Sequence, residues 1–298
     1  MATREAIRHF RRTIQNACFS FRAAGAVLFG SAARGDEKPD SDADLLVVGI
    51  GLPQARHRRS RETAEVKRVF APLPLDVILM TSEEVQSNFR NHNPLFLDIA
   101  EDGIILLDTD GLLEGLISTT RRYVAEKGIE RIAGGWRFQV ERGAATFLSK
   151  VSNADFSAAM LRDAERDHQV GCRLSAEGFH DKAVYHFQQA VEKSIKAVLI
   201  ALGVFKRTHA VGESLEGLCA AGQVPPEWRE RLLTAAEHSA NLEADLSLSR
   251  YPGIVEDQLW LPSEEYVPED ARAAEARSTE TLGIARAFVD EWFSGPAE

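Results

Sequence analysis

The sequence predicts an α/β domain with a small mixed sheet, followed by an all-α bundle of antiparallel helices. Before residue 110, short apolar runs closed by turn residues, such as 26–29 and 45–48, are typical of buried strands. From about residue 153 the apolar residues recur at helical spacing over long segments. At about 100–200 residues per domain the 298 residues fit two domains, and we divide them into 1–110, a connector of 111–152 and a bundle of 153–298.

The composition is that of an ordinary globular protein, with 44% apolar and 27% charged residues. The formal net charge of −10 weighs against general nucleic-acid binding, because such binding rests on neutralising phosphates. The three cysteines are widely spaced and match neither a disulfide framework nor a zinc site, which indicates a reducing compartment, the cytoplasm. We expect no signal peptide, because the charged start lacks an apolar core, and no membrane span, because no apolar run is long enough.

Helices and strands are expected to alternate in the first domain. Thr81 and Glu84 have the spacing of a capping box and therefore predict a helix start. The expected elements are helices over residues 3–22, 54–70 and 82–89, and strands over residues 26–29, 45–48, 73–80 and 102–108. The connector is less regular: its first part suggests a helix, two glycines at 134–135 break the pattern, and residues 136–140 are either a strand or a helix start.

A dense basic string, ARHRRSRE at residues 55–62, opens the expected helix over 54–70. It is either a solvated helix face or a surface that meets a triphosphate, an acidic partner or an RNA. We favour the solvated face, because charge runs on helices are usually solvated.

A phosphate turn and two carboxylates follow one another between residues 27 and 48. Gly30-Ser31 comes directly after an apolar run; glycine lets the backbone approach a ligand closely and serine adds a hydroxyl, so the pair suits a phosphate. Asp42 and Asp44 lead into the next run, and their spacing places both side chains on one side of a strand. Adjacent carboxylates repel unless a cation lies between them, and Mg²⁺ with substrate phosphates is a common solution.

These residues resemble the signature of the nucleotidyltransferase superfamily that includes DNA polymerase β. The strings GSAARG and SDADLLVV are similar to those of its compact branch, the minimal nucleotidyltransferases. The resemblance implies a third carboxylate on a later strand, and Asp76 in the apolar run 73–80 supplies it.

The site that this resemblance implies has three parts. Asp42, Asp44 and Asp76 are the expected catalytic and metal-binding residues, holding two Mg²⁺ ions. Gly30 and Ser31 are expected to hold the phosphates of a nucleoside triphosphate, with ATP as the expected substrate. Arg34 either contacts a phosphate, which its planar guanidinium suits, or forms an ion pair with Asp36 or Asp40.

The second half of the chain predicts four long helices, which suggest an antiparallel bundle. We expect Asp181 to cap the second helix and Gly203 to end it. The four expected helices cover residues 155–177, 183–202, 225–248 and the stretch from residue 268 onward.

The strings YHFQQAVEKSIKAVLIALG, THAVGESLEGL and SRYPG resemble the HEPN family of helical domains, over most of residues 153–298. Many members are RNases that use an arginine, a polar residue and a nearby histidine. Here Arg162 and His168 lie too early, Arg231 and His238 lack the polar residue, and Arg250 has no histidine after it. We therefore expect no RNA cleavage. We give His186 and His209 structural roles and expect Lys193 and Lys196 to be solvated.

The two resemblances together imply an enzyme that moves a nucleoside monophosphate, AMP from ATP, to a hydroxyl group and releases pyrophosphate. The acceptor is either a small molecule or a protein. The alternative is a toxin–antitoxin-like module in which the HEPN domain binds nucleotide or RNA. The complete carboxylate set favours the enzyme, and the long apolar faces of the bundle lead us to expect a homodimer.

Overall fold

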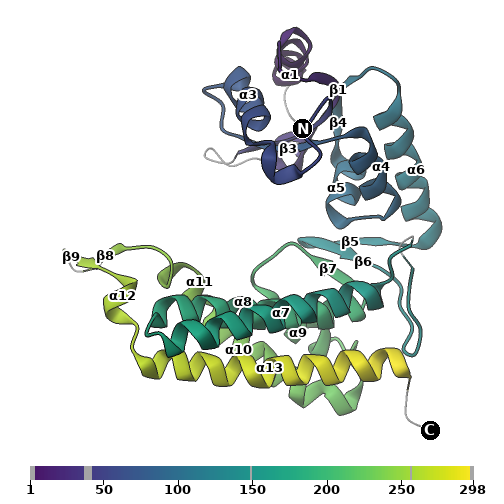
Figure 1. Cartoon of the computed structure of the whole chain (residues 1–298). Helices are drawn as coiled ribbons and strands as arrows, with labels where there is room; N and C mark the ends of the chain where they lie inside the picture. Colours follow the sequence, from purple (N-terminus) through teal and green to yellow (C-terminus); the bar gives the residue numbers. More distant parts are fainter. Residues whose placement is uncertain (1–3, 37–41, 148–149, 256, 296–298) are drawn as a thin grey trace. The chain divides into compact units, whose positions relative to one another are not determined.

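The computed structural model describes residues 4–36, 42–147, 150–255 and 257–295, and the chain forms two compact units, Met1–Gly128 and Ile129–Glu298 (Figure 1). Each unit is described by itself. Within the described residues, no helix is both long enough and apolar enough to cross a bilayer.

The first unit is built on a four-stranded mixed sheet. Its elements are α1 (Arg4–Asn16), β1 (Arg22–Phe29), α2 (Gly30–Arg34), β2 (Ala43–Ile50), η1 (Arg56–Arg58), α3 (Ser60–Phe70), β3 (Leu75–Met80), α4 (Ser82–Arg90), α5 (Pro94–Asp102), β4 (Ile104–Asp108) and α6 (Leu112–Lys127). The strand order is β3-β2-β1-β4. β1 runs antiparallel to β2 and β4, whereas β2 and β3 are parallel.

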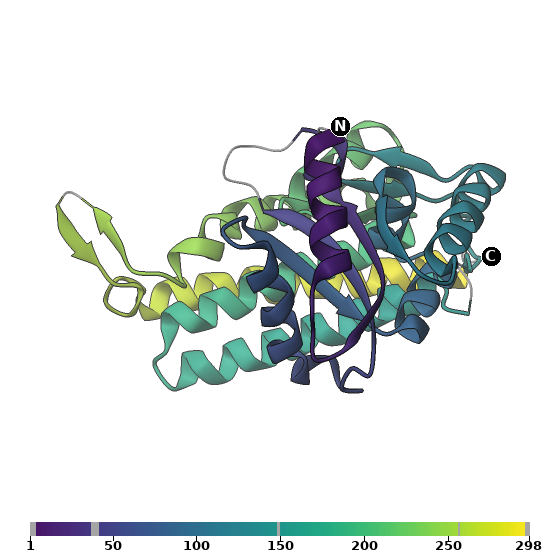
Figure 2. The ribbon, with the colours of Figure 1, turned by 90° about the horizontal axis from the view of Figure 1, so that it is seen from above.

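Helices cover both faces of this sheet, which explains why its strands read as unbroken apolar runs. One face is covered by α1 and α3 (Figure 2). There Phe10 of α1 and Phe70 of α3 pack in one core with Leu45 of β2. On the other face, residues of α4, α5 and α6, including Leu113, pack with Leu46. Neighbouring residues of one strand thus enter different cores, as the two-residue period of a strand requires.

The structure differs from the expected elements of the first unit in four places. The first helix ends at Asn16, and Phe21 is buried in the core beside the start of β1, so its helical spacing was a coincidence. Gly30-Ser31 opens a short helix instead of a turn. The helix over 54–70 is split, because Arg59 turns inward between η1 and α3. A further helix, α5, lies between α4 and β4. The Thr81–Glu84 capping box is confirmed.

The expected connector is shared between the two units. Its first part is α6, whose Leu113 and Ile117 are buried with Phe96 in the core of the first unit. Its next part is β5 (Glu130–Ile132) and β6 (Gly135–Arg137), which form a small sheet with β7 (Val204–Lys206) in the second unit. Residues 135–137 are thus a strand, and the Trp136 residue is 2% exposed.

Four long helices make the body of the second unit, as expected (Figure 1). They are α7 (Asn153–Ala176), α8 (His180–Ala201), α10 (Arg229–Glu243) and α13 (Pro268–Ser294). Shorter elements complete the unit: α9 (Val211–Ala220), η2 (Pro226–Trp228), α11 (Asp245–Leu248), β8 (Gly253–Val255), β9 (Gln258–Trp260) and α12 (Pro262–Glu265). Phe187, Ile195, Leu232 and Phe288 lie in one shared core.

The ends of α8 differ in how well the sequence predicted them. Gly203 follows the helix with φ +75°, and a Cβ there would lie 2.3 Å from the Phe138 carbonyl oxygen, so glycine is required as expected. Asp181 does not cap the helix, because α8 already begins at His180 with Phe179 in the cap position. The buried Asp181 side chain pairs instead with Lys182, at 2.8 Å.

Candidate functional site

Strand register brings two of the three expected carboxylates to neighbouring positions. β2 and β3 pair in parallel with Asp44 opposite Asp76. Asp44 also lies opposite Phe29 of β1, the residue directly before Gly30. Both aspartates share strand parity with Leu46 and therefore lie on the sheet face that α4, α5 and α6 cover. Three strands that are distant in sequence thus place Gly30, Asp44 and Asp76 at one end of the sheet.

The backbone of Gly30 lies directly against the carboxylate of Asp44. Gly30 has φ +70°, a conformation that L side chains rarely adopt, and a Cβ built on it would lie 2.1 Å from Asp44 Oδ2. The glycine therefore has a steric function that its position in a phosphate turn did not reveal. It leaves room for a carboxylate beside the backbone that would meet a phosphate.

Asp42 lies just before β2, which begins at Ala43, and its side chain is exposed. Asp76 is also exposed, and Asp44 is half-buried. In the part of the chain that the structure describes, no three His, Cys, Asp or Glu side chains lie close enough together to hold a metal ion. The register therefore aligns Asp44 with Asp76 but leaves the three carboxylates apart.

The chemistry of these residues nevertheless suits Mg²⁺. Asp42, Asp44 and Asp76 offer carboxylate oxygens, the ligands that hard divalent cations prefer. Because Gly30 has no Cβ, the Asp44 carboxylate lies directly against its backbone, where a Cβ would be 2.1 Å from Oδ2. Exposed carboxylates also leave coordination positions for water and substrate phosphates, as Mg²⁺ sites usually do.

Arg34 forms the structural contacts that were the alternative to phosphate binding. Its Nε lies 3.0 Å from Asp36 Oδ2, and its Nη1 lies 3.0 Å from Oδ2 of Asp102 at the end of α5. The hydrogen bond to Asp36, opposed by partial burial and supported by the bond to Asp102, raises the pKa of the guanidinium. Asp40, the other expected partner, lies outside the described residues. Arg34 ties α2 to α5, and its phosphate contact stays a prediction.

The basic string at residues 55–62 is largely structural where it meets α4. Arg59 is 2% exposed, donates to the carbonyl oxygens of Pro53, Gln54 and Leu79, and holds Glu84 Oε2 at 2.6 Å. Burial acts to raise the pKa of Glu84, but hydrogen bonds from Arg59, the Thr81 amide and Arg56 outweigh it and lower the pKa to about 2. We name this contact the Arg59–Glu84 clamp.

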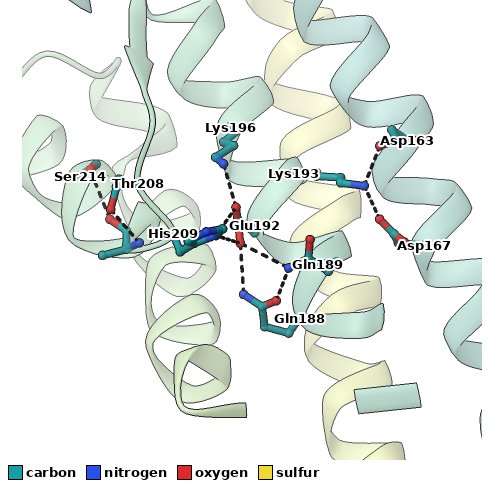
Figure 3. Close-up of polar contacts among 11 residues, drawn as sticks. Asp163, Asp167, Gln188, Gln189, Glu192, Lys193, Lys196, Thr208, His209 and Ser214 are labelled. Carbon is teal, nitrogen blue, oxygen red and sulfur yellow. Dashed lines mark hydrogen bonds and ion pairs between the residues drawn. The ribbon is translucent and has the colours of Figure 1, made fainter. Parts of the chain in front are cut away.

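The second unit contains a buried carboxylate that the sequence did not single out. Glu192 on α8 is 3% exposed, and its oxygens lie 2.7 Å from Lys196 Nζ and 3.0–3.1 Å from His209 Nδ1 (Figure 3). Gln188 and Gln189 donate to the same carboxylate. Burial raises its pKa, but the bonds and charges of Lys196 and His209 outweigh this, so the pKa is lowered. The four-residue spacing of Gln188 and Glu192, beside the apolar face, was the available signal.

The expected structural roles of the histidines and one lysine can be compared with their contacts. His209 ties the loop before α9 to Glu192, and His186 Nδ1 lies 3.0 Å from Asp167 Oδ1. Lys193 is not freely solvated, because its Nζ lies 2.6 Å from Asp163 and 2.5 Å from Asp167 (Figure 3). Those two bonds outweigh burial and raise the pKa of Lys193.

Two of the arginines and both histidines that resemble RNase residues have structural partners. His168 Nδ1 lies 3.0 Å from Ser278 Oγ, and His238 Nδ1 lies 3.1 Å from Thr281 Oγ1, so both join their helices to α13. The Arg231 guanidinium lies over the Trp228 ring, at 4.2 Å. The Arg250 guanidinium lies over the Tyr185 ring, at 5.3 Å.

Comparison with protein families agrees with this two-part organisation. A nucleotidyltransferase domain model matches residues 11–106, and a HEPN domain model matches residues 157–290. The fold and the matches therefore define a nucleotidyltransferase domain followed by a HEPN domain. The chain belongs to the family of minimal nucleotidyltransferases fused to a C-terminal HEPN domain.

Individual proteins match about half of the chain. The putative toxin MJ1304 of Methanocaldococcus jannaschii is 32% identical over 139 residues, which are 47% of this chain and 91% of that protein. A crystal structure of ST0689, an archaeal HEPN homologue, aligns with 45% of this chain and 97% of its own, with 23% identity and a TM-score of 0.33. A crystal structure of a toxin–antitoxin with AMP-PNP aligns with 42% and 94%, with 18% identity and a TM-score of 0.25.

Proposed function

We propose that this protein transfers a nucleoside monophosphate, AMP from ATP, to a hydroxyl group of a small molecule or a protein. The nucleotidyltransferase domain supports a transferase activity. The observation that carries the proposal is the register of β1, β2 and β3, which places the Gly30 backbone and the carboxylates of Asp44 and Asp76 at one end of the sheet.

The residues take the following roles in the proposed reaction. Gly30 and Ser31 bind the triphosphate through backbone and hydroxyl groups, and Asp42, Asp44 and Asp76 hold Mg²⁺. When bound, Mg²⁺ neutralises phosphate charge and makes the acceptor hydroxyl more acidic. Asp76 accepts the proton of the acceptor hydroxyl while the oxygen of that hydroxyl forms a bond to the α-phosphorus. The bond from the α-phosphorus to the bridging oxygen breaks, and pyrophosphate leaves with that electron pair.

The test is incubation with each α-labelled nucleoside triphosphate and Mg²⁺, with and without candidate acceptors, followed by detection of labelled product and pyrophosphate. Asp44→Asn and Asp76→Asn should each lower the rate by at least about 10²–10³, the typical cost of one lost electrostatic contact at a reacting centre. Asp110→Asn is the matched control, because Asp110 is exposed just beyond Asp108, which pairs with Gly25 far from Gly30. Wild-type rates in either active-site variant would refute the assignment.

A second candidate function is that the HEPN unit acts as a toxin-type module that binds nucleotide or RNA. The observation that favours it is the 32% identity to a protein named as a putative toxin. Expression of residues 129–298 should then arrest growth, whereas the full chain should not. Normal growth on expression of residues 129–298 at a level comparable to the full chain would refute this second candidate.

A further inference from the structure

Charge is segregated within the first unit, although the whole chain is acidic. Residues 4–22 and 54–70 contain eleven of the 17 Lys and Arg residues of Met1–Gly128, but only three of its 18 Asp and Glu residues. The rest of the unit carries six cations against 15 acids. The two basic segments contain α1 and α3, which lie side by side (Figures 1 and 2). The ring centroids of Phe10 and Phe70 are 5.2 Å apart.

Four arginines of these two helices lie on their outer sides, whereas Arg11 of α1 donates to the carbonyl oxygen of Ile105 in β4. In α1 the apolar Phe10 and Ile14 are buried, so Arg8 and Arg12, one helical turn apart, lie on the outer side. In α3 the buried Val66 and Phe70 place Arg61 and Arg68 outward in the same way. We define the α1–α3 basic surface by its exposed members, Arg8, Arg12, Arg58, Arg61, Lys67 and Arg68.

The chemistry of this surface suits phosphates. Five of its six cations are arginines, whose planar guanidinium binds phosphate oxygens in a bidentate manner. A nucleic-acid duplex carries one negative charge per about 1.7 Å of its axis, a density that two adjacent basic helices match. Five of the 15 acids in the remainder belong to α4 and α5, which lie on the opposite face of the sheet and so away from a polyanion bound to α1 and α3.

Other anionic partners fit the surface less well. A membrane-surface helix inserts its apolar face between lipids, but Phe10 and Ile14 are occupied by the sheet. Binding of single strands relies on stacking of bases on exposed aromatic rings, and the phenyl rings of α1 and α3, Phe10 and Phe70, are buried, which leaves only the small His9 ring exposed on these two helices. We propose that the α1–α3 basic surface binds the sugar-phosphate backbone of a nucleic-acid duplex, without reading its sequence.

The net charge of the whole chain alone led to the opposite expectation, that nucleic acid does not bind. The net charge of −10 is a sum over the whole chain, in which acidic regions outweigh the basic layer of α1 and α3. A bound duplex contacts only the layer that faces it. The inference does not depend on the proposed transfer reaction, because it concerns binding by residues on the sheet face opposite to Asp44 and Asp76.

The test is fluorescence anisotropy of the full-length protein with labelled 20-base-pair RNA and DNA duplexes, at salt concentrations from 50 to 200 mM. We expect micromolar binding at 50 mM salt to both duplexes, and a linear fall of log affinity with log salt. The triple variant Arg12→Glu, Arg58→Glu, Arg68→Glu should bind at least tenfold more weakly and lower the salt slope by about three on DNA.

The matched control reverses three cations elsewhere in the same unit, with Arg90→Glu, Arg122→Glu and Lys127→Glu. It changes the net charge equally and should bind within threefold of the wild type, and circular dichroism should show that both variants are folded. Three results would overturn the proposal: no duplex binding by the wild type at 50 mM salt, equal losses in the two triple variants, or competition by poly-glutamate or anionic vesicles as effective as that by unlabelled duplex.

Discussion

At the residue scale, the candidate site depends on the absence of a side chain at Gly30. Gly30 is the point where the backbone of β1 passes the carboxylate of Asp44. Because any Cβ would lie 2.1 Å from Asp44 Oδ2, the carboxylate would have to turn or the strand end would have to move. The site is therefore sensitive to a single methyl group at a residue that has no reactive atom of its own.

Gly30→Ala should accordingly reduce nucleotide transfer by a factor of about 10² or more, because an error of ~1 Å in the position of a reacting group has that effect. Gly51→Ala is the matched control: Gly51 also has a left-handed φ, +87°, but has open space around its Cβ position. Both variants should lose stability from backbone strain, on the order of 1–3 kcal/mol. Thermal melts and transfer rates measured together separate the two effects, and equal rates in the two variants would contradict the role of Gly30.

At the element scale, the Arg59–Glu84 clamp fixes the start of α4 against the segment that precedes α3. Arg59 donates to three backbone carbonyls and to Glu84, so one buried guanidinium joins the segment before η1, the end of β3 and α4. The capping box adds reciprocal bonds between Thr81 and Glu84. The clamp therefore holds the chain directly after the strand that carries Asp76.

The clamp should give the protein a dependence on acid. The pKa of Glu84 in the folded protein is about 2, below its ordinary value of 4.5. The ionised carboxylate therefore stabilises the fold fully above about pH 5, and this stabilisation is lost as the pH falls towards 2. This lowering of the pKa corresponds to about 3 kcal/mol of the free energy of unfolding at neutral pH. We expect Glu84→Gln to flatten the free energy of unfolding between pH 5 and 2, measured by urea titration. Glu83→Gln, at the exposed neighbour, should keep the wild-type profile.

The elements differ in how well the sequence could predict them. The strands carrying Asp44 and Asp76 were predictable, because burial on both faces makes strands such as β2 uniformly apolar. Their pairing was not, since register depends on the path of the chain between them. The burial of Arg59 could not be predicted from a basic string, because its partners are backbone carbonyls that only the fold brings together. Glu192 was missed for a similar reason, since its partner His209 lies on another element.

At the scale of the whole molecule, the division after Gly128 predicts which fragment of the first unit is stable. A fragment of residues 1–110 loses α6, and with it Leu113 and Ile117 from the core that contains Phe96. Loss of each large buried side chain costs about 2–5 kcal/mol. We expect a fragment of residues 1–128 to unfold cooperatively at a clearly higher temperature than 1–110 in calorimetry. Equal melting temperatures would show that α6 is not part of the folded unit.

The second unit should lack RNase activity in the full chain. The histidines nearest to an RNase-like arginine, His168 and His238, are hydrogen-bonded to α13 residues, and Arg250 lies over aromatic rings. We expect no metal-independent cleavage of single-stranded RNA on a denaturing gel, and no change with Arg250→Ala. Cleavage that disappears with Arg250→Ala or His168→Ala would show that the second unit has a reactive centre.

The parallel pairing of β2 with β3 also affects when a growing chain can complete the candidate site. Parallel neighbours need a crossover, and here it runs through η1 and α3, so Asp76 leaves the ribosome well after Asp44. A nascent chain that ends before β3 already carries Gly30, Ser31 and Asp44 but lacks the carboxylate proposed to take the acceptor's proton. If Asp76 takes that proton, a chain that still lacks β3 is unable to carry out the proposed transfer.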